Sequence, residues 1–116
     1  MPEPIYKILS EAAYEAAKRE GRYSGSADDA RDGFIHLSAV NQLAGTLAGH
    51  FAGQADLLLV ALDPDLLGPE LKWEPSRGGA LFPHLYGPLD FATVVGVEKL
   101  ELGDDGRHVL PEGGSR

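Results

Sequence analysis

The sequence predicts a single α+β domain in which helices are grouped against a small sheet. Its length of 116 residues is typical of one domain. Short segments with strand character are separated by two segments with a helical repeat of apolar residues. The predicted order is strand, helix, loop, strand, helix, strand and then mostly strands, which is typical of the α+β class. We expect one domain over 1–116, with an ordered core at about 4–102 and a polar tail at 103–116.

The first predicted strand and helix lie at the start of the chain. Residues 5–9 (IYKIL) contain β-branched and aromatic residues and predict a short strand. Ser10 is a suitable N-cap for a helix over 11–20, and Gly21 is suited to end that helix. Residues 22–33 (RYSGSADDARDG) are rich in turn-forming types and predict a surface loop.

A second strand and helix follow the loop. Residues 34–38 (FIHLS) predict a strand, and Ser38 is expected to cap the next helix. The apolar residues of that helix are spaced at i, i+3, i+4, i+7, i+8 and i+11, which forms one continuous stripe for a core. They are Val40, Leu43, Ala44, Leu47, Ala48 and Phe51.

Strands dominate the second half of the chain. Residues 56–63 (DLLLVALD) have an uninterrupted apolar interior, which predicts a strand buried on both faces. After a break rich in proline and glycine, residues 71–74 (LKWE) predict a short strand. Residues 91–102 alternate apolar and polar types in their second half and predict a long strand.

The composition excludes several classes of protein. Eighteen acidic and ten basic residues give a formal net charge of -8, which argues against binding to nucleic acid. The absence of cysteine excludes disulfides, thiolate catalysis and cysteine-ligated metals. We expect a cytoplasmic protein without a signal peptide or membrane partner, because no apolar run is long enough to span a bilayer. The oligomeric state is left open.

His36 is the first candidate for chemistry. Strand alternation places Phe34, His36 and Ser38 on one face and Ile35 and Leu37 on the other. If the apolar pair is buried, His36 faces solvent or a cleft. It is then either a hydrogen-bonded structural histidine or a pocket residue that donates to a substrate hydroxyl or transfers a proton.

Residues 77–89 (RGGALFPHLYGPL) concentrate glycine, proline and reactive side chains in one stretch. Pro83 favours extended backbone before it, and Gly87 permits a bend after Tyr86. This bracketing places His84 and Tyr86 on one face. The segment is either a packed turn or the wall of a cleft, and we predict the cleft wall.

The residues just before this stretch add further candidates. Arg77, next to Ser76 and two glycines, is suited to hold a carboxylate or phosphate, or is an exposed loop residue. Glu74 is a possible general base or orienting carboxylate, or a solvated glutamate. Trp73 is interpreted as a core residue, with a stacking platform as the alternative. No spacing typical of a histidine metal site is present, so no metal is predicted.

Several segments together resemble the domain of unknown function family 952, a group of small bacterial proteins, over about residues 4–102. This resemblance implies an ADP-ribosyltransferase-like fold, with a split, strongly curved sheet around an NAD-shaped cleft. The segments are IYKIL, DGFIHLS, HFAG, WEPSRGG and LFPHLYGPL.

The run from IYKILS to FIHLS also resembles, more distantly, the start of the tRNA 2′-phosphotransferases. By that likeness His36 is the cleft histidine and Ser38 its neighbour. The first strand departs from those enzymes, because Lys7-Ile8-Leu9 stands where they have His-Gly-Thr. Glu74 is the candidate for the glutamate of many ADP-ribosyltransferases, and His84 is the alternative for the last motif position.

The leading hypothesis is a protein that binds or processes NAD or an ADP-ribose-type ligand. His36 would then contact ribose, Arg77 the pyrophosphate, and Tyr86 or Trp73 a flat ring. One alternative is a non-catalytic module for a nucleotide or small anionic metabolite. Another is a phosphoesterase that uses two His-Leu-hydroxyl motifs, 36–38 and 84–86. We assign His36, His84 and Glu74 to catalysis, and Lys7, Ser38, Trp73, Ser76, Arg77 and Tyr86 to ligand binding.

Overall fold

The computed structural model describes residues 3–110, apart from the side chain of Arg77. The strands in this range are β1 (Ile5–Ser10), β2 (Arg22–Tyr23), β3 (Ile35–His36), β4 (Ser38–Ala39), β5 (Leu57–Leu62), β6 (Leu71–Pro75), β7 (Leu81–Leu85), β8 (Leu89–Asp90), β9 (Val94–Leu102) and β10 (His108–Val109). They form a five-stranded sheet of order β10-β9-β5-β1-β4, a three-stranded sheet β3-β7-β6 and the pair β2-β8. Every pairing is antiparallel.

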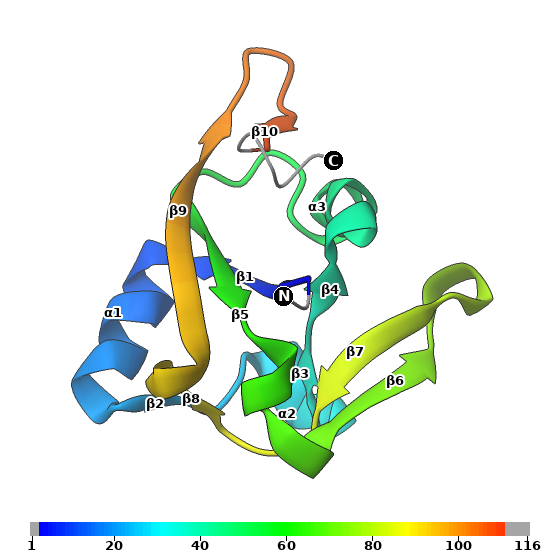
Figure 1. Cartoon of the computed structure of the whole chain (residues 1–116). Helices are drawn as coiled ribbons and strands as arrows, with labels where there is room; N and C mark the ends of the chain where they lie inside the picture. The colour runs from blue at the N-terminus through cyan, green and yellow to red at the C-terminus, as the bar shows by residue number, and fades with distance from the viewer. Residues whose placement is uncertain (1–2, 111–116) are drawn as a thin grey trace.

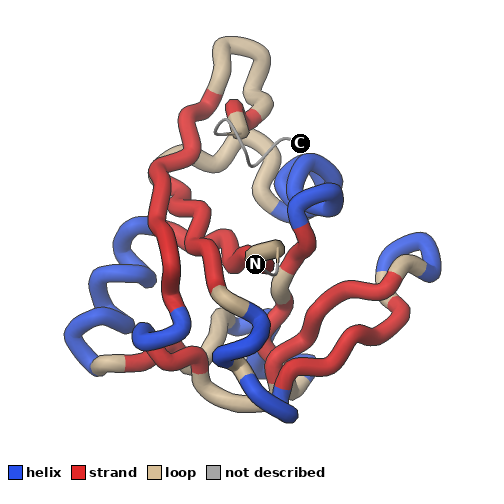
Figure 2. Tube along the Cα trace, viewed as in Figure 1, coloured by secondary structure: helices blue, strands red, loops and turns tan. Residues whose placement is uncertain are grey.

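The helices are short and lie around the strands (Figure 2). They are α1 (Glu11–Glu20), α2 (Ala27–Asp32) and α3 (Leu43–His50), together with the 3-10 turns η1 (Val40–Gln42), η2 (Pro64–Leu66), η3 (Gly68–Glu70), η4 (Arg77–Gly79) and η5 (Phe91–Thr93). In Figure 1, α1 packs beside the curled five-stranded sheet, and the β6-β7 hairpin projects on the other side. The predicted α+β class with a curved antiparallel sheet is confirmed.

The first strand and helix agree with the sequence prediction. The Ser10 side chain accepts a hydrogen bond from the Ala13 amide at 3.1 Å, as an N-cap does. Gly21 ends α1 in the left-handed conformation, with φ of 87°, which glycine adopts without steric cost.

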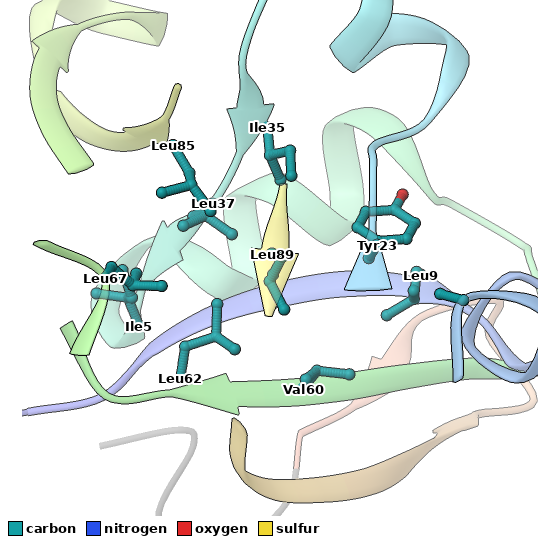
Figure 3. Packing of buried hydrophobic residues seen from close by; sticks show 11 residues of the cluster. Ile5, Leu9, Tyr23, Ile35, Leu37, Val60, Leu62, Leu67, Leu85 and Leu89 are labelled. Atoms are coloured by element: carbon teal, nitrogen blue, oxygen red, sulfur yellow. The ribbon is translucent and has the colours of Figure 1, made fainter. Parts of the chain in front are cut away.

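The central strand β5 lies between β1 and β9, and it is buried on both faces, as predicted, because an apolar cluster packs against each face. Leu57 and Leu59 belong to one apolar cluster with residues of β1 and α3. Val60 and Leu62 point into a second cluster, drawn in Figure 3. The sheet therefore separates two cores. The second cluster consists of Ile5, Leu9, Ala17, Tyr23, Ile35, Leu37, Val60, Leu62, Leu67, Leu85 and Leu89.

The predicted loop over 22–33 is wrong in part, because it contains β2 and the helix α2. A reciprocal capping box starts this helix. The Ser26 side chain accepts from the Asp29 amide at 3.2 Å, and the Asp29 carboxylate accepts from the Ser26 amide at 2.9 Å. Tertiary contacts of Asp29 hold the short helix in a segment whose residue types favour turns.

The single strand predicted over 34–38 is also corrected. Two short strands replace it, and they belong to different sheets, since β3 pairs with β7 and β4 pairs with β1. The change of sheet falls at Leu37, which is buried and donates its amide proton to the Pro83 carbonyl at 3.1 Å. This segment therefore joins the two larger sheets.

Ser38 does not cap the following helix, contrary to the prediction. Its hydroxyl lies 2.9 Å from the Thr46 hydroxyl, and the Gln42 side chain instead accepts from the Ala39 amide at 2.9 Å. The helix predicted from Val40 is a 3-10 turn followed by α3, and only Leu43 and Leu47 of the apolar stripe are fully buried.

The segment expected as a polar tail over 103–116 contains β10, which pairs with β9. Residues 111–116 lie outside the described residues. The predicted strand over 91–102 begins with η5, so β9 starts at Val94. Within residues 3–110, no helix has the length and apolarity needed to cross a membrane.

Candidate functional site

A cavity of about 290 Å³ lies where the two larger sheets meet, and five of the nine predicted site residues line it. These are Lys7, His36, Ser38, Ser76 and His84. The other lining residues are Tyr6, Ile8, Ser26, Asp28, Asp29, Arg31, Asp32, Leu37, Thr46, His50, Phe51 and Phe82. Segments far apart in the sequence thus converge on one site, and the predicted cleft wall includes Phe82 and His84 of β7.

The register of β3 and β7 brings the two histidines together. His36 and His84 are directly opposite each other, with ring centroids 5.8 Å apart. Phe34 stacks on the His84 ring at 4.0 Å and is tilted against His36 at 4.6 Å. Ile35 and Leu85 point to the core on the opposite face. The face predicted from alternation in FIHLS is therefore confirmed.

Glu74 holds His84 rather than lining the cavity itself. The Glu74 carboxylate lies 2.8 Å from His84 Nδ1 and accepts a hydrogen bond from the Tyr86 hydroxyl at 2.7 Å. The hydrogen bonds from His84 and then Tyr86 lower the pKa of Glu74, and the bond to Glu74 raises the pKa of Tyr86. The carboxylate is therefore ionised at neutral pH and fixes the His84 ring through Nδ1.

The second ring nitrogen of His84 is available to a ligand. His84 is 4% exposed and lines the cavity, yet its Nε2 has no hydrogen-bond partner among residues 3–110. In the described part of the chain, every fully buried side-chain nitrogen or oxygen has a partner. Nε2 therefore keeps some solvent exposure, on a side chain that lines the cavity.

Asp29, which the sequence analysis did not single out, organises the cavity floor. It is 3% exposed, and one carboxylate oxygen lies 2.9 Å from Lys7 Nζ. The other oxygen accepts from the His36 amide at 3.1 Å and lies 2.6 Å from His36 Nδ1. The spacing of Ser26 and Asp29, which matches a capping box, was the available signal in the sequence.

The buried pair of Lys7 and Asp29 is ionised. Burial lowers the pKa of Lys7, although the Asp29 carboxylate opposes this shift. For Asp29, burial acts to raise the pKa, but the Lys7 charge and the hydrogen bonds from His36 and Ser26 together bring the pKa below its ordinary value. Lys7 also donates to the His36 carbonyl at 3.2 Å, so its ammonium group joins β1 to α2 and β3.

His36 has both ring nitrogens engaged by carboxylates. Nδ1 faces Asp29, and Nε2 lies 2.9 Å from Asp32. An ionised carboxylate only accepts hydrogen bonds, so both contacts are satisfied when both ring nitrogens carry protons. His36 therefore reaches the cavity as predicted, but its polar atoms serve to hold α2 against β3.

The remaining predicted residues lie away from the cavity. Glu74 and Tyr86 contact it only through His84, and neither is a lining residue. Trp73 is 46% exposed on the opposite face of β6, so the interpretation as a core residue is wrong. The side chain of Arg77 lies outside the described residues.

A metal centre has no support in the described residues. No group of three or more histidine, aspartate or glutamate side chains in residues 3–110 is arranged to hold an ion.

The fold and the cavity define a small α+β protein with a curled antiparallel sheet and a histidine-carboxylate cleft. The family model described as protein of unknown function (DUF952) matches residues 8–97, and the chain belongs to this family, as the sequence resemblance indicated.

Solved structures of a related protein share the fold. The crystal structure of protein CC0527 from Caulobacter crescentus is 51% identical, covers 97% of this chain and 99% of that chain, and has a TM-score of 0.93. The solution NMR structure of CC0527 is 55% identical over 90% of each chain, with a TM-score of 0.81. The search of curated proteins gave no match.

Proposed function

We propose that the cavity binds a nucleoside-type ligand of the NAD or ADP-ribose class. The observation that carries this proposal is the convergence of Lys7, His36, Ser38, Ser76 and His84 on one cavity. Its volume of about 290 Å³ is close to the lower limit of about 300 Å³ for pockets that hold small ligands.

The side of the cavity formed by α2 suits the hydroxyl groups of a ribose. Asp28 and Asp32 line it, and their carboxylate oxygens can accept hydrogen bonds from hydroxyl donors. Across the cavity, the hydroxyls of Ser38 and Thr46 both donate and accept. These groups supply the paired acceptors and adaptable donors that a vicinal diol requires.

The opposite end suits the rest of such a ligand. Phe51 and Phe82 line the cavity and offer apolar surface for a flat ring. Ser76 lies at the start of the hairpin tip, which is remote from α2 in Figure 1. Phosphate groups at this tip would avoid the carboxylates of α2. Arg77 belongs to the same turn, η4, where the sequence analysis expected a pyrophosphate contact.

Replacement of Asp28 by asparagine is expected to weaken ADP-ribose binding about five- to tenfold, because an exposed charge-assisted hydrogen bond contributes about 1 kcal/mol. Calorimetric titration of the purified protein with ADP-ribose and NAD measures this effect. Wild type is expected to bind with a dissociation constant between about 1 μM and 1 mM, a range that corresponds to about 8 to 4 kcal/mol.

Asp105→Asn is the matched control. The side chains of Asp28 and Asp105 are 68% and 67% exposed, and each pairs with an arginine, but only Asp28 lines the cavity. Asp105→Asn is therefore expected to bind like wild type. Equal affinities of the two variants, or no binding of either ligand by wild type, would contradict the proposal.

A further inference from the structure

We infer that the cleft is catalytic, with His84 as a general base held by Glu74, and that it hydrolyses an N-glycosidic bond of its ligand. This inference rests on the proposed function, since it requires a nucleoside-type ligand in the cavity. It extends that function by assigning a reaction and an atom, Nε2 of His84, at which the proton is accepted.

The contacts of His84 suit it to act as a base. An ionised glutamate on Nδ1 holds the tautomer whose proton is on Nδ1, which leaves the Nε2 lone pair free on a side chain that lines the cavity. Phe34 stacks on the ring and limits its rotation. A carboxylate, an oriented imidazole and an open nitrogen are the components of a general base.

His36 lies opposite His84, but it has no ring nitrogen without a partner. Both of its ring nitrogens face carboxylates, at 2.6 and 2.9 Å. It therefore has no open nitrogen with which to accept a proton from water. The two histidines have different tasks, and a mechanism with two equivalent histidines is disfavoured.

The charged side chains that line the cavity indicate which bond is cleaved. Lys7 and Arg31 line the cavity, but Lys7 is paired with Asp29, and Arg31 lies 3.2 Å from both Asp28 and Asp32. Among the described side chains, no lining lysine or arginine is left unpaired for an anionic transition state. Phosphoester hydrolysis develops such an anion, so the cavity suits it poorly.

Cleavage of an N-glycosidic bond requires negatively charged groups instead of cationic ones. Its transition state carries positive charge on the ribose ring, as in other glycosidic reactions. Three carboxylates, including those of Asp28 and Asp32, line the cavity against two cationic side chains, Lys7 and Arg31. This excess of negative charge at the proposed ribose position favours a positively charged transition state. The same groups that recognise the ribose hydroxyls thus favour reaction at the adjacent bond.

With NAD as the substrate, the step balances without a further reactant. The oxygen of a water molecule bonds to C1′ of the nicotinamide ribose, and the C1′–N bond breaks. Its electron pair remains on the pyridinium nitrogen, which becomes neutral and leaves without a proton. Nε2 of His84 takes the proton of the attacking water and returns it to solvent. The products are ADP-ribose, nicotinamide and one proton.

Release of nicotinamide from NAD by wild type, His84→Gln, Glu74→Gln and His108→Gln tests this inference. Loss of the base is expected to lower the rate about 10²- to 10⁴-fold in His84→Gln. His108 bonds to the Gln54 carbonyl and does not line the cavity, so His108→Gln is the control and is expected to keep the wild-type rate.

Glu74→Gln tests the positioning role at a half-buried side chain with a substitution that keeps its size. An amide does not select the tautomer as a carboxylate does, so we expect a lower rate and a changed pH profile. ADP-ribose titration of every variant is recorded in parallel. A wild type that binds ADP-ribose but releases no nicotinamide overturns the inference and leaves the proposed function standing.

Two further outcomes are decisive. If His84→Gln binds ADP-ribose and releases nicotinamide at the wild-type rate, His84 is not the base and the inference is wrong. If wild type neither binds nor reacts, both the inference and the proposed function fail. Retained binding by His84→Gln, together with loss of its activity, supports both.

Discussion

Asp29→Asn is expected to lower the free energy of unfolding by about 3–5 kcal/mol, because it leaves the charge of Lys7 buried without a partner. A loss of this size is a large part of the roughly 5–15 kcal/mol that stabilises a typical domain. The substitution also weakens the contacts of the Asp29 carboxylate with the His36 ring and the Ser26 amide. Urea denaturation followed by circular dichroism measures the change.

Asp28→Asn is the control for this prediction, since it makes the same chemical change at the neighbouring residue. Asp28 is exposed and pairs only with exposed Arg31, and such pairs contribute about 1 kcal/mol or less. Its unfolding curve is expected to lie near that of wild type. An Asp29→Asn protein as stable as Asp28→Asn would show that the buried pair does not hold the cavity floor together.

The Asp29 carboxylate makes the free energy of unfolding depend on pH. The folded-state pKa of Asp29 is lowered, so the unfolded state binds the proton more readily. The stabilisation is therefore present above the unfolded pKa of about 3.9 and is lost as the pH falls through the folded value. Asp29→Asn is expected to lose less stability than wild type on acidification in this range.

Leu62→Ala is expected to cost about 2–5 kcal/mol, through lost burial and the cavity that it leaves in the core. Leu62 is 0% exposed in β5 and belongs to the cluster shown in Figure 3. Leu66→Ala makes the same chemical change at a residue that is 56% exposed, and it is expected to cost about 0.5 kcal/mol or less. Urea denaturation of both variants distinguishes them, and equal losses would contradict the assigned core.

The elements that the sequence predicts well are those whose signals are local. β1, α1 and β5 follow from alternation, an uninterrupted apolar run and helix caps at Ser10 and Gly21, all contained in neighbouring residues. The helix α2 was missed because its stability comes from Asp29, whose partners Lys7 and His36 lie 22 and 7 positions away in the chain. Residue types alone do not predict such a tertiary contact.

In the candidate site, too, the sequence predicts the features that depend on neighbouring residues and misses those that depend on tertiary contacts. Alternation placed His36 and His84 on the correct faces, because period two is a property of each strand alone. The pairing of β3 with β7, which sets the histidines opposite each other, depends on the whole sheet. The contacts of both His36 ring nitrogens with Asp29 and Asp32 were not predicted, because these two aspartates were assigned to a loop and not to the helix α2.

The most direct test of the different tasks of the two histidines is nitrogen NMR of their ring atoms, recorded at neutral pH with and without ADP-ribose. We expect the signals of both His36 ring nitrogens, which contact Asp29 and Asp32, to change little when ADP-ribose is added. We expect His84 to carry its proton on Nδ1, with an Nε2 signal that shifts when ADP-ribose is added. A bare, ligand-sensitive nitrogen on His36, or His84 signals that ignore ADP-ribose, would contradict the assignment of His84 as the reactive group of this cleft.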